Sequence, residues 1–315
     1  MVPDAEFTSY YGRPVIKEPV WEVPDVPAYL FLGGLAGASS VLAAGAQLAG
    51  YRELTRISKV AALGAITLSG VALVHDLGRP GRFLNMLRVF KPSSPMSVGS
   101  WLLAGYGPVA GAAALAEVTG TFPRAGAAAT AGAGLLGPAI ATYTAALICD
   151  TAVPAWHEAH REMPYVFAGS AASAAGGLGL LLTRPADAQP ARNLAVLGAS
   201  VELVAKRALM SRLAATPGQS LAEPYERGQA GVVLRVAEVL TAGGLAGAAL
   251  GGRSRAVSAL SGAALVAASA MTRYGIFQAG MASARDPKYV IVPQRTRRER
   301  AECSRGNVTS SRPSA

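Results

Sequence analysis

The chain has 315 residues, of which 51% are hydrophobic and only 15% are charged, and its mean hydropathy is +0.32. This composition excludes an ordinary soluble globular protein and is typical of an integral membrane protein. The formal net charge of +10 points to a membrane surface and not to nucleic acid, because the basic residues flank apolar segments or lie in the C-terminal tail.

Eight apolar segments are long enough to cross a hydrocarbon core about 30 Å thick, which requires roughly 20 residues of helix. They are predicted at about 27–50, 58–76, 97–119, 126–148, 164–183, 193–212, 232–250 and 256–279. We therefore predict an all-α integral membrane protein with eight transmembrane helices. The polar linker 149–163 divides them into two four-helix halves, 27–148 and 164–279, between a polar N-terminal segment (1–26) and a basic, disordered C-terminal tail (280–315).

A polar loop lies between the second and third segments, from His75 to Trp101. It begins with HDLGRPGRF (75–83) and ends with MSVGSW (96–101), so an imidazole, a carboxylate and an indole are placed at one membrane face. Asp76 and Arg79 also suit a structural role, because the Pro-Gly pair that follows forces the chain to reverse. The other cations of the loop are Arg82, Arg88 and Lys91.

Ionisable residues inside the apolar segments are expensive to bury and usually face a partner or a watery cavity. Glu202 and Lys206 are four apart on the sixth segment, so they share a helix face and are expected to pair. Arg235 and Glu238 are three apart on the seventh segment, and Arg273 lies late in the eighth. These groups are candidates for intramembrane ion pairs that fix the packing or for a proton relay. Snorkelling of the two arginines to the near interface is the simpler alternative.

Most of these groups fall in the half of the membrane nearest the termini, at the level of His75, Asp76, Tyr29, Trp101 and Tyr143. The far half is poor in polar groups. This asymmetry predicts a polar pocket that opens to one side. An apolar ligand with two oxygens, such as a quinone, would enter such a pocket from the lipid and accept hydrogen bonds there. A carboxylate near the surface would relay the protons that its reduction needs.

Redox groups of the chain's own are not expected. The two cysteines, Cys149 and Cys303, cannot supply the four thiolates of an iron–sulfur cluster, so any cluster must belong to a partner. Only His75 approaches a segment, which argues against axial haem ligation. His157 and His160 have a spacing that would allow metal binding, but no third and fourth ligands are evident. We therefore predict no metal site.

Two elements of the polar loop, DLGRP and MSVGSW, are similar to motifs of a known protein family. Together with YLFLGG (29–34) and YTA (143–145), these elements resemble the NrfD/PsrC family of membrane subunits, over about residues 20–280. The resemblance implies an eight-helix quinone-reactive anchor without haem or an iron–sulfur cluster of its own. It also implies two partners, a four-cluster ferredoxin-like iron–sulfur subunit and a catalytic subunit, expected to carry molybdopterin.

Carried over by position, the resemblance makes Tyr143 the residue that contacts menaquinone or ubiquinone. It places Asp76 and Arg79 in the loop at the iron–sulfur interface, where the neighbouring cations of that loop are also expected. An aromatic anchor at the membrane interface is the alternative role for Tyr143. The family has Asn and His just before the first span, whereas this chain has WEVPD at 21–25. Either Glu22 or Asp25 substitutes, or the quinone is held differently.

The sequence thus predicts a membrane subunit that exchanges electrons between the quinone pool and the clusters of a partner. The excess of Lys and Arg on one side places both termini in the cytoplasm and the chain in the inner membrane, an orientation that depends on the basic tail. A secondary transporter or proton-translocating protein is the alternative, since intramembrane Glu, Lys and Arg suit it equally. The missing inverted repeat and the apolar far half argue against it.

Overall fold

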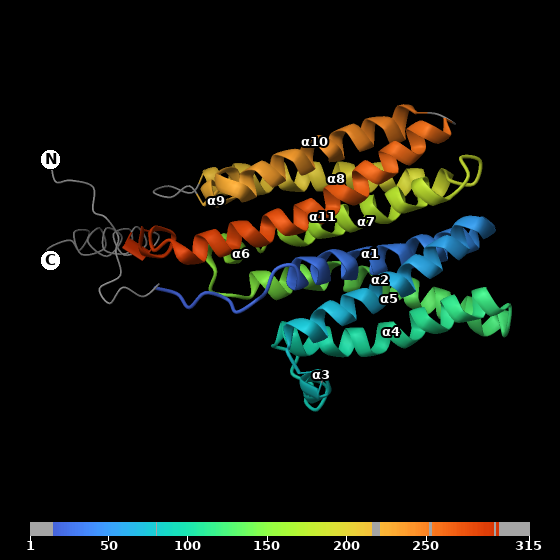
Figure 1. The fold of residues 1–315 in the computed structure, drawn as a ribbon, viewed down its shortest axis with the longest axis horizontal. Coiled ribbons are helices and arrows are strands. Elements are labelled where there is room, and N and C mark those ends of the chain that lie inside the picture. The colour runs from blue at the N-terminus through green and yellow to red at the C-terminus, as the bar shows by residue number, and fades with distance from the viewer. Residues whose placement is uncertain (1–14, 80, 216–220, 252–253, 293, 296–315) are drawn as a thin grey trace, which may run out of the picture.

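The computed structural model describes residues 15–79, 81–215, 221–251, 254–292 and 294–295, and all regular secondary structure in these ranges is helical (Figure 1). Among the described residues, seven helices are long and apolar enough to cross a membrane. They are α1 (Asp25–Leu48), α2 (Arg52–Asp76), α4 (Pro95–Thr119), α5 (Pro123–Cys149), α7 (Met163–Leu182), α10 (Gly228–Leu250) and α11 (Arg255–Arg285). The prediction of an all-α membrane protein is confirmed to this extent.

The sixth predicted segment corresponds to α8 (Gln189–Ala214), which is long enough to span but too polar to count among the seven. It carries Arg192, Glu202, Lys206, Arg207 and Arg212. Helix α8 nevertheless packs closely along α7: a Cβ at Gly169, Gly176 or Gly198 would collide with the backbone of the facing helix. Small residues at these crossings let the two helices approach as helices in lipid do.

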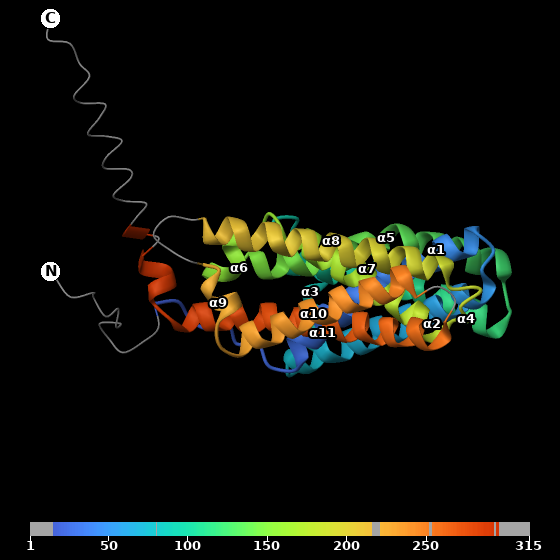
Figure 2. The ribbon, with the colours of Figure 1, turned by 90° about the horizontal axis from the view of Figure 1, so that it is seen from above.

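Three short helices, α3 (Gly81–Met86), α6 (Pro154–Glu158) and α9 (Glu223–Glu226), lie at the same end of the bundle as residues 15–24 and 286–292 (Figures 1 and 2). We call this the terminal end. The connections α1–α2, α4–α5, α7–α8 and α10–α11 lie at the other end, the far end. Successive connections thus lie at opposite ends of the bundle, and the loops that were predicted to face the termini lie at the terminal end.

The helix packing repeats along the chain. Helices α1, α2, α4 and α5 pack with one another, and α7, α8, α10 and α11 pack in the corresponding pairs. At the α1–α5 crossing Gly37 lies against Gly137, and at the α7–α11 crossing Gly177 lies against Gly262. A side chain at any of these four positions would collide with the facing backbone. Helix α1 also packs against α7, which joins the two groups (Figure 1).

The predicted boundary between the last helix and the C-terminal tail was wrong. Helix α11 continues to Arg285, beyond the predicted end at residue 279, and residues 288–292 are also helical. The predicted disordered tail therefore does not begin at residue 280. Arg285 pairs with Glu18 at 2.5 Å, and Lys288 pairs with Glu223 at 3.1 Å. Residues 296–315, with most of the predicted tail, lie outside the described ranges.

An aromatic cluster closes the terminal end. The Trp156 side chain of α6 is fully buried, stacks on Trp21 with ring centroids 5.5 Å apart, and donates its indole N–H to the Ile276 carbonyl at 2.8 Å. The Tyr225 hydroxyl of α9 donates to the Ala155 carbonyl at 2.8 Å, and burial raises its pKa well above the ordinary value. These contacts fix the N-terminal segment and the short helices against α11.

Candidate functional site

Helices α1, α2, α4 and α5 enclose a small cavity of about 130 Å³ at the terminal end. Tyr29, Asp76, Ser100 and Tyr143 supply its polar groups, one from each helix. Trp21 of the N-terminal segment and Met86 of α3 also line it, together with Val26, Leu73, Leu77, Met96, Leu103 and Leu147. Three of the five residues predicted for the quinone pocket, Tyr29, Asp76 and Tyr143, thus lie around one space.

The phenol of Tyr143 is the polar group most available to a ligand in this cavity. Its hydroxyl is buried and has no hydrogen-bond partner among the described residues. The ring packs edge-on to Tyr29, with centroids 6.4 Å apart, and lies against α4 at Gly99, where a Cβ would meet the ring. A buried hydroxyl that makes no hydrogen bond is costly and rare, so a ligand oxygen that accepted from it would recover that cost.

The N-terminal segment is tied to the end of α2. The Glu22 backbone N–H donates to Asp76 Oδ1 at 3.1 Å, and His75 Nδ1 lies 2.6 Å from Asp25 Oδ2. Glu22 and Asp25 do not line the cavity. They therefore do not take the place of the missing Asn and His in the lining of the cavity. Their contacts hold the N-terminal segment against the end of α2, above the cavity.

His75 faces a different space. Its side chain is 75% exposed, and it lines an apolar groove of about 790 Å³ between α2 and α4. Leu73 and Leu103 line both this groove and the Tyr143 cavity, so the two spaces are neighbours on either side of these side chains. The groove lies on the outer surface of apolar helices, where lipid would surround it. It offers a lateral approach to the buried hydroxyl.

Trp101 does not lie in the cavity, contrary to the prediction. It is 43% exposed, packs edge-on to Phe90, and its indole N–H points to the Val89 carbonyl at 3.5 Å. Ser100 faces the cavity instead, because one residue along a helix turns the side chain by about 100°. The indole holds the α3–α4 loop against α4.

The four cations predicted for a partner interface are exposed at the terminal end, and Arg82 donates to the Leu77 carbonyl at 2.8 Å. They are Arg79, Arg82, Arg88 and Lys91. They surround the α3 loop, next to the residues that close the Tyr143 cavity. Their position is compatible with a partner that approaches the cavity from this end.

The expected Glu202–Lys206 pair does not form. Lys206 Nζ reaches across to α10, where it pairs with Glu238 at 2.9 Å and donates to the Leu234 carbonyl. Glu202 turns into the bundle and accepts from the Thr272 hydroxyl at 2.9 Å and from the Ser173 hydroxyl at 3.3 Å. Spacing on one helix places two groups on one face, but neighbouring helices decide which partner each group takes.

Arg273 does not snorkel to the interface. It is fully buried between α11, α7 and α1, with its guanidinium 3.6 Å from the centroid of the Phe167 ring. Nη2 donates to the Phe167 carbonyl at 2.7 Å, whereas Nε and Nη1 have no partner among the described residues. Gly34 on α1 leaves room for this side chain. The small residue opposite the arginine was a signal that sequence reasoning missed.

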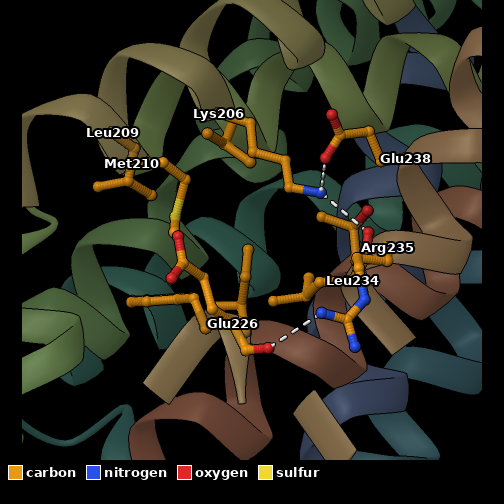
Figure 3. A pocket seen from close by; sticks show the side chains of 11 residues that line it. Lys206, Leu209, Met210, Glu226, Leu234, Arg235 and Glu238 are labelled. Carbon is orange, nitrogen blue, oxygen red and sulfur yellow. Dashed lines mark hydrogen bonds and ion pairs between the residues drawn. The ribbon is translucent and has the colours of Figure 1, made fainter. Parts of the chain in front are cut away.

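A second cavity, of about 360 Å³, opens between α8, α9, α10 and α11 (Figure 3). Lys206, Glu226, Arg235, Glu238 and Thr272 line it with apolar neighbours. Arg235 donates to the Glu226 carbonyl at 3.3 Å and does not pair with Glu238. Three of the five residues predicted as relay or ion-pair groups, Lys206, Arg235 and Glu238, therefore line this cavity, but with other partners than their spacing suggested.

The far end also contains a polar cluster, which the sequence did not reveal. Lys59 is buried, pairs with Glu117 at 2.7 Å and donates to Gln47 Oε1 at 3.0 Å. A cavity of about 220 Å³ adjoins the three side chains. Lys59 lies in the second turn of α2, near the far end. The far half of the bundle is therefore less apolar than predicted. The scarcity of polar groups there is accordingly a weaker argument against a transporter.

One ion pair at the terminal end makes a pH-dependent contribution. Glu162 precedes α7, and Arg212 binds both of its carboxylate oxygens, at 2.6 and 2.7 Å. The hydrogen bond from Arg212 holds the pKa of the Glu162 carboxyl below its ordinary value. Because the pKa is lowered in the folded protein, the stabilisation is present above the ordinary pKa and is lost as pH falls through the folded-state pKa.

We expect Glu162→Gln to lower the free energy of unfolding at neutral pH by about 1 kcal/mol, the upper range for a partly exposed pair. The difference in the free energy of unfolding between this variant and the unsubstituted protein should decrease as the pH falls through the acidic range. Thermal unfolding in detergent at several pH values measures it. Glu53→Gln is the control, because Glu53 forms no ion pair among the described residues. A difference that stayed constant with pH would contradict the assignment.

The fold and its cavities define a multi-pass helical membrane protein with a small pocket at its terminal end. The chain matches the family model described as polysulphide reductase, NrfD, over residues 15–121. The matched residues include the 75–101 loop, whose motifs indicated a resemblance to this family. The match spans α1 to α4 and thus most of the Tyr143 cavity, while Tyr143 itself and the second group of helices lie beyond it. None of the curated proteins matches the chain.

Proposed function

We propose that the chain is the quinone-reactive membrane subunit of an oxidoreductase complex, and that the quinone ring binds in the Tyr143 cavity. The observation that carries the proposal is the buried, partnerless hydroxyl of Tyr143 beside an apolar groove that faces the lipid. The match of residues 15–121 to the NrfD family model supports a membrane subunit of a reductase. Menaquinone or ubiquinone is the expected substrate, entering laterally past Leu73 and Leu103.

Some of the cavity residues bind the quinone, and another supplies protons to it. The Tyr143 hydroxyl donates a hydrogen bond to a quinone carbonyl, and Tyr29 confines the ring from α1. Reduction of a quinone to a quinol consumes two electrons and two protons. Asp76 lies at the terminal end of α2 and lines the cavity, so it is placed to relay protons between the aqueous face and the ring.

The electrons come from a partner in this proposal. The described residues contain no group of three or more metal-ligating side chains, and the function requires a redox chain that ends near the cavity. We propose a four-cluster iron–sulfur subunit on the terminal end, held by Arg79, Arg82, Arg88 and Lys91, and a catalytic subunit beyond it. Cations of this kind steer an acidic partner surface into place.

We further propose that α8 crosses the membrane with the seven apolar helices, which gives eight spans in two four-helix halves. The support is its length, its close packing along α7 and the repeated helix pairs. Glu202 and Lys206 turn toward neighbouring helices, and Arg212 lies near the end of α8, where it pairs with Glu162. Arg207 is exposed. Eight spans keep both termini on one side, which we place in the cytoplasm of the cell with the bundle in the inner membrane.

The test is quinone binding by the Tyr143→Phe variant. Loss of one hydrogen bond to a neutral acceptor costs about 1 kcal/mol, so we expect the affinity for a short-chain naphthoquinone to fall by about five- to tenfold. Tyr165→Phe is the control, because Tyr165 is exposed on α7, away from the cavity. Binding is followed by titration of the purified protein in detergent. Equal affinity of Tyr143→Phe and the unsubstituted protein would refute the assignment.

A further inference from the structure

The Glu202 carboxyl lies near the midpoint of α8 and is 2% exposed. Its two oxygens accept from hydroxyls on different helices, Thr272 on α11 and Ser173 on α7. None of these three residues lines the Tyr143 cavity, which belongs to α1, α2, α4 and α5. The carboxyl is therefore a separate buried titratable group that the proposed quinone chemistry does not use.

A buried counter-charge makes both protonation states of Glu202 accessible. Arg273 follows Thr272 in the chain, is fully buried, and attracts the Glu202 carboxylate electrostatically. Two of its nitrogens have no partner among the described residues, so no other carboxylate neutralises it there. Lys206 is the second cation near Glu202, but it is already paired with Glu238. Glu202 can thus be an ionised carboxylate beside Arg273, or a neutral carboxylic acid that is hydrogen-bonded to the hydroxyl groups.

Thr272 connects this buried carboxyl to an open cavity. Its hydroxyl donates to Glu202 Oε1, and the same residue lines the cavity between α8 and α11. Figure 3 shows the other walls, where Lys206 reaches Glu238 and Arg235 reaches the Glu226 carbonyl. Charged side chains at membrane depth require water around them, so this cavity is expected to be hydrated.

We propose that Glu202 is a proton-exchange site, supplied from the hydrated cavity through the Thr272 hydroxyl. A hydronium or water in the cavity gives a proton to Thr272 Oγ1 while Thr272 passes its own proton to Glu202 Oε1. One O–H bond forms at the carboxyl, the hydroxyl is restored, and the cavity loses one proton. Release follows the reverse path. On the α7 side Ser173 and Ser170 are hydroxyls without charge, so exchange has a single charged entrance, at Lys206, Arg235, Glu226 and Glu238.

The experiment is infrared spectroscopy of the full-length protein reconstituted in lipid, at several pH values, in H₂O and after transfer to D₂O. We expect a buried carboxylic acid C=O band that titrates with pH, shifts on deuteration and is missing in Glu202→Gln. Thr272→Val should slow the deuterium shift of that band by about 100-fold, which is the lower range for a positioned proton-transfer group. Thr272→Ser should restore the rate, since it keeps the hydroxyl.

Ser173→Ala is the matched control, because it removes a hydroxyl contact to Glu202 on the α7 side, and Ser173 does not line the cavity. Its exchange rate should stay near that of the unsubstituted protein. The proposal is overturned if Glu202 gives no protonated band at any pH, or if Ser173→Ala slows exchange as much as Thr272→Val. Naphthoquinone affinity, measured on the same variants, reports the Tyr143 cavity alone, so failure of either proposal is recognised separately.

Discussion

Arg273→Met is expected to lower the free energy of unfolding by about 3–5 kcal/mol, because it leaves the buried Glu202 carboxylate without a compensating charge. Three contributions act together. The Phe167 carbonyl loses its donor, the Phe167 ring loses the guanidinium above it, and Glu202 loses the buried cation that attracts it. Unfolding in detergent by heat or by a denaturing detergent measures the loss.

The double variant Arg273→Met with Glu202→Gln separates the charge contribution from the rest. An amide can accept from Thr272 as the carboxylate does, and it needs no counter-charge. We therefore expect the double variant to be more stable than Arg273→Met alone. Arg235→Met is the control, because Arg235 is exposed at the cavity wall and should change the stability by no more than about 0.5 kcal/mol. A double variant less stable than Arg273→Met would contradict the charge pairing.

The sequence was sufficient to predict most of the helices, because a membrane helix needs only length and apolar composition. The positions of the helix ends were harder to predict. Helix α2 begins at Arg52, before its predicted start at 58, and α11 continues to Arg285. Both extensions contain polar residues, which hydropathy places outside the bilayer although the helical hydrogen bonds continue. Helix α8 is the opposite case: its charges lower the hydropathy, yet its glycines pack it against α7.

Pairing across helices could not be predicted from spacing. Lys206 and Glu202 are on one helix face, but Glu238 on α10 and Thr272 on α11 are closer partners for them. Arg273 sits near a helix end in the sequence, and only the fold shows that α6, α9 and the N-terminal segment cover that end. Tyr29, Asp76 and Tyr143 line one cavity because each lies near the terminal end of its helix. That this cavity binds a quinone stays a prediction.

The sharpest test of the Tyr143 cavity is a methyl group on the facing helix. Gly99→Ala places a Cβ within the space that the Tyr143 ring occupies, so the ring or α4 must shift. Overpacking of this kind costs about 1–3 kcal/mol. If the strain is relieved by moving the ring, naphthoquinone affinity should fall by about 100-fold, more than in Tyr143→Phe, because the ring that shapes the cavity is displaced together with its hydroxyl.

Gly105→Ala is the matched control on the same helix, since a Cβ there meets no atom within 4 Å. It should bind the naphthoquinone like the unsubstituted protein. Adding Tyr143→Phe to Gly99→Ala should lower the affinity little further, because the displaced hydroxyl no longer reaches the ligand. Additive losses in the double variant would show that Gly99 acts on the quinone by another route, and that the Tyr143 hydroxyl keeps its contact when α4 is pushed away.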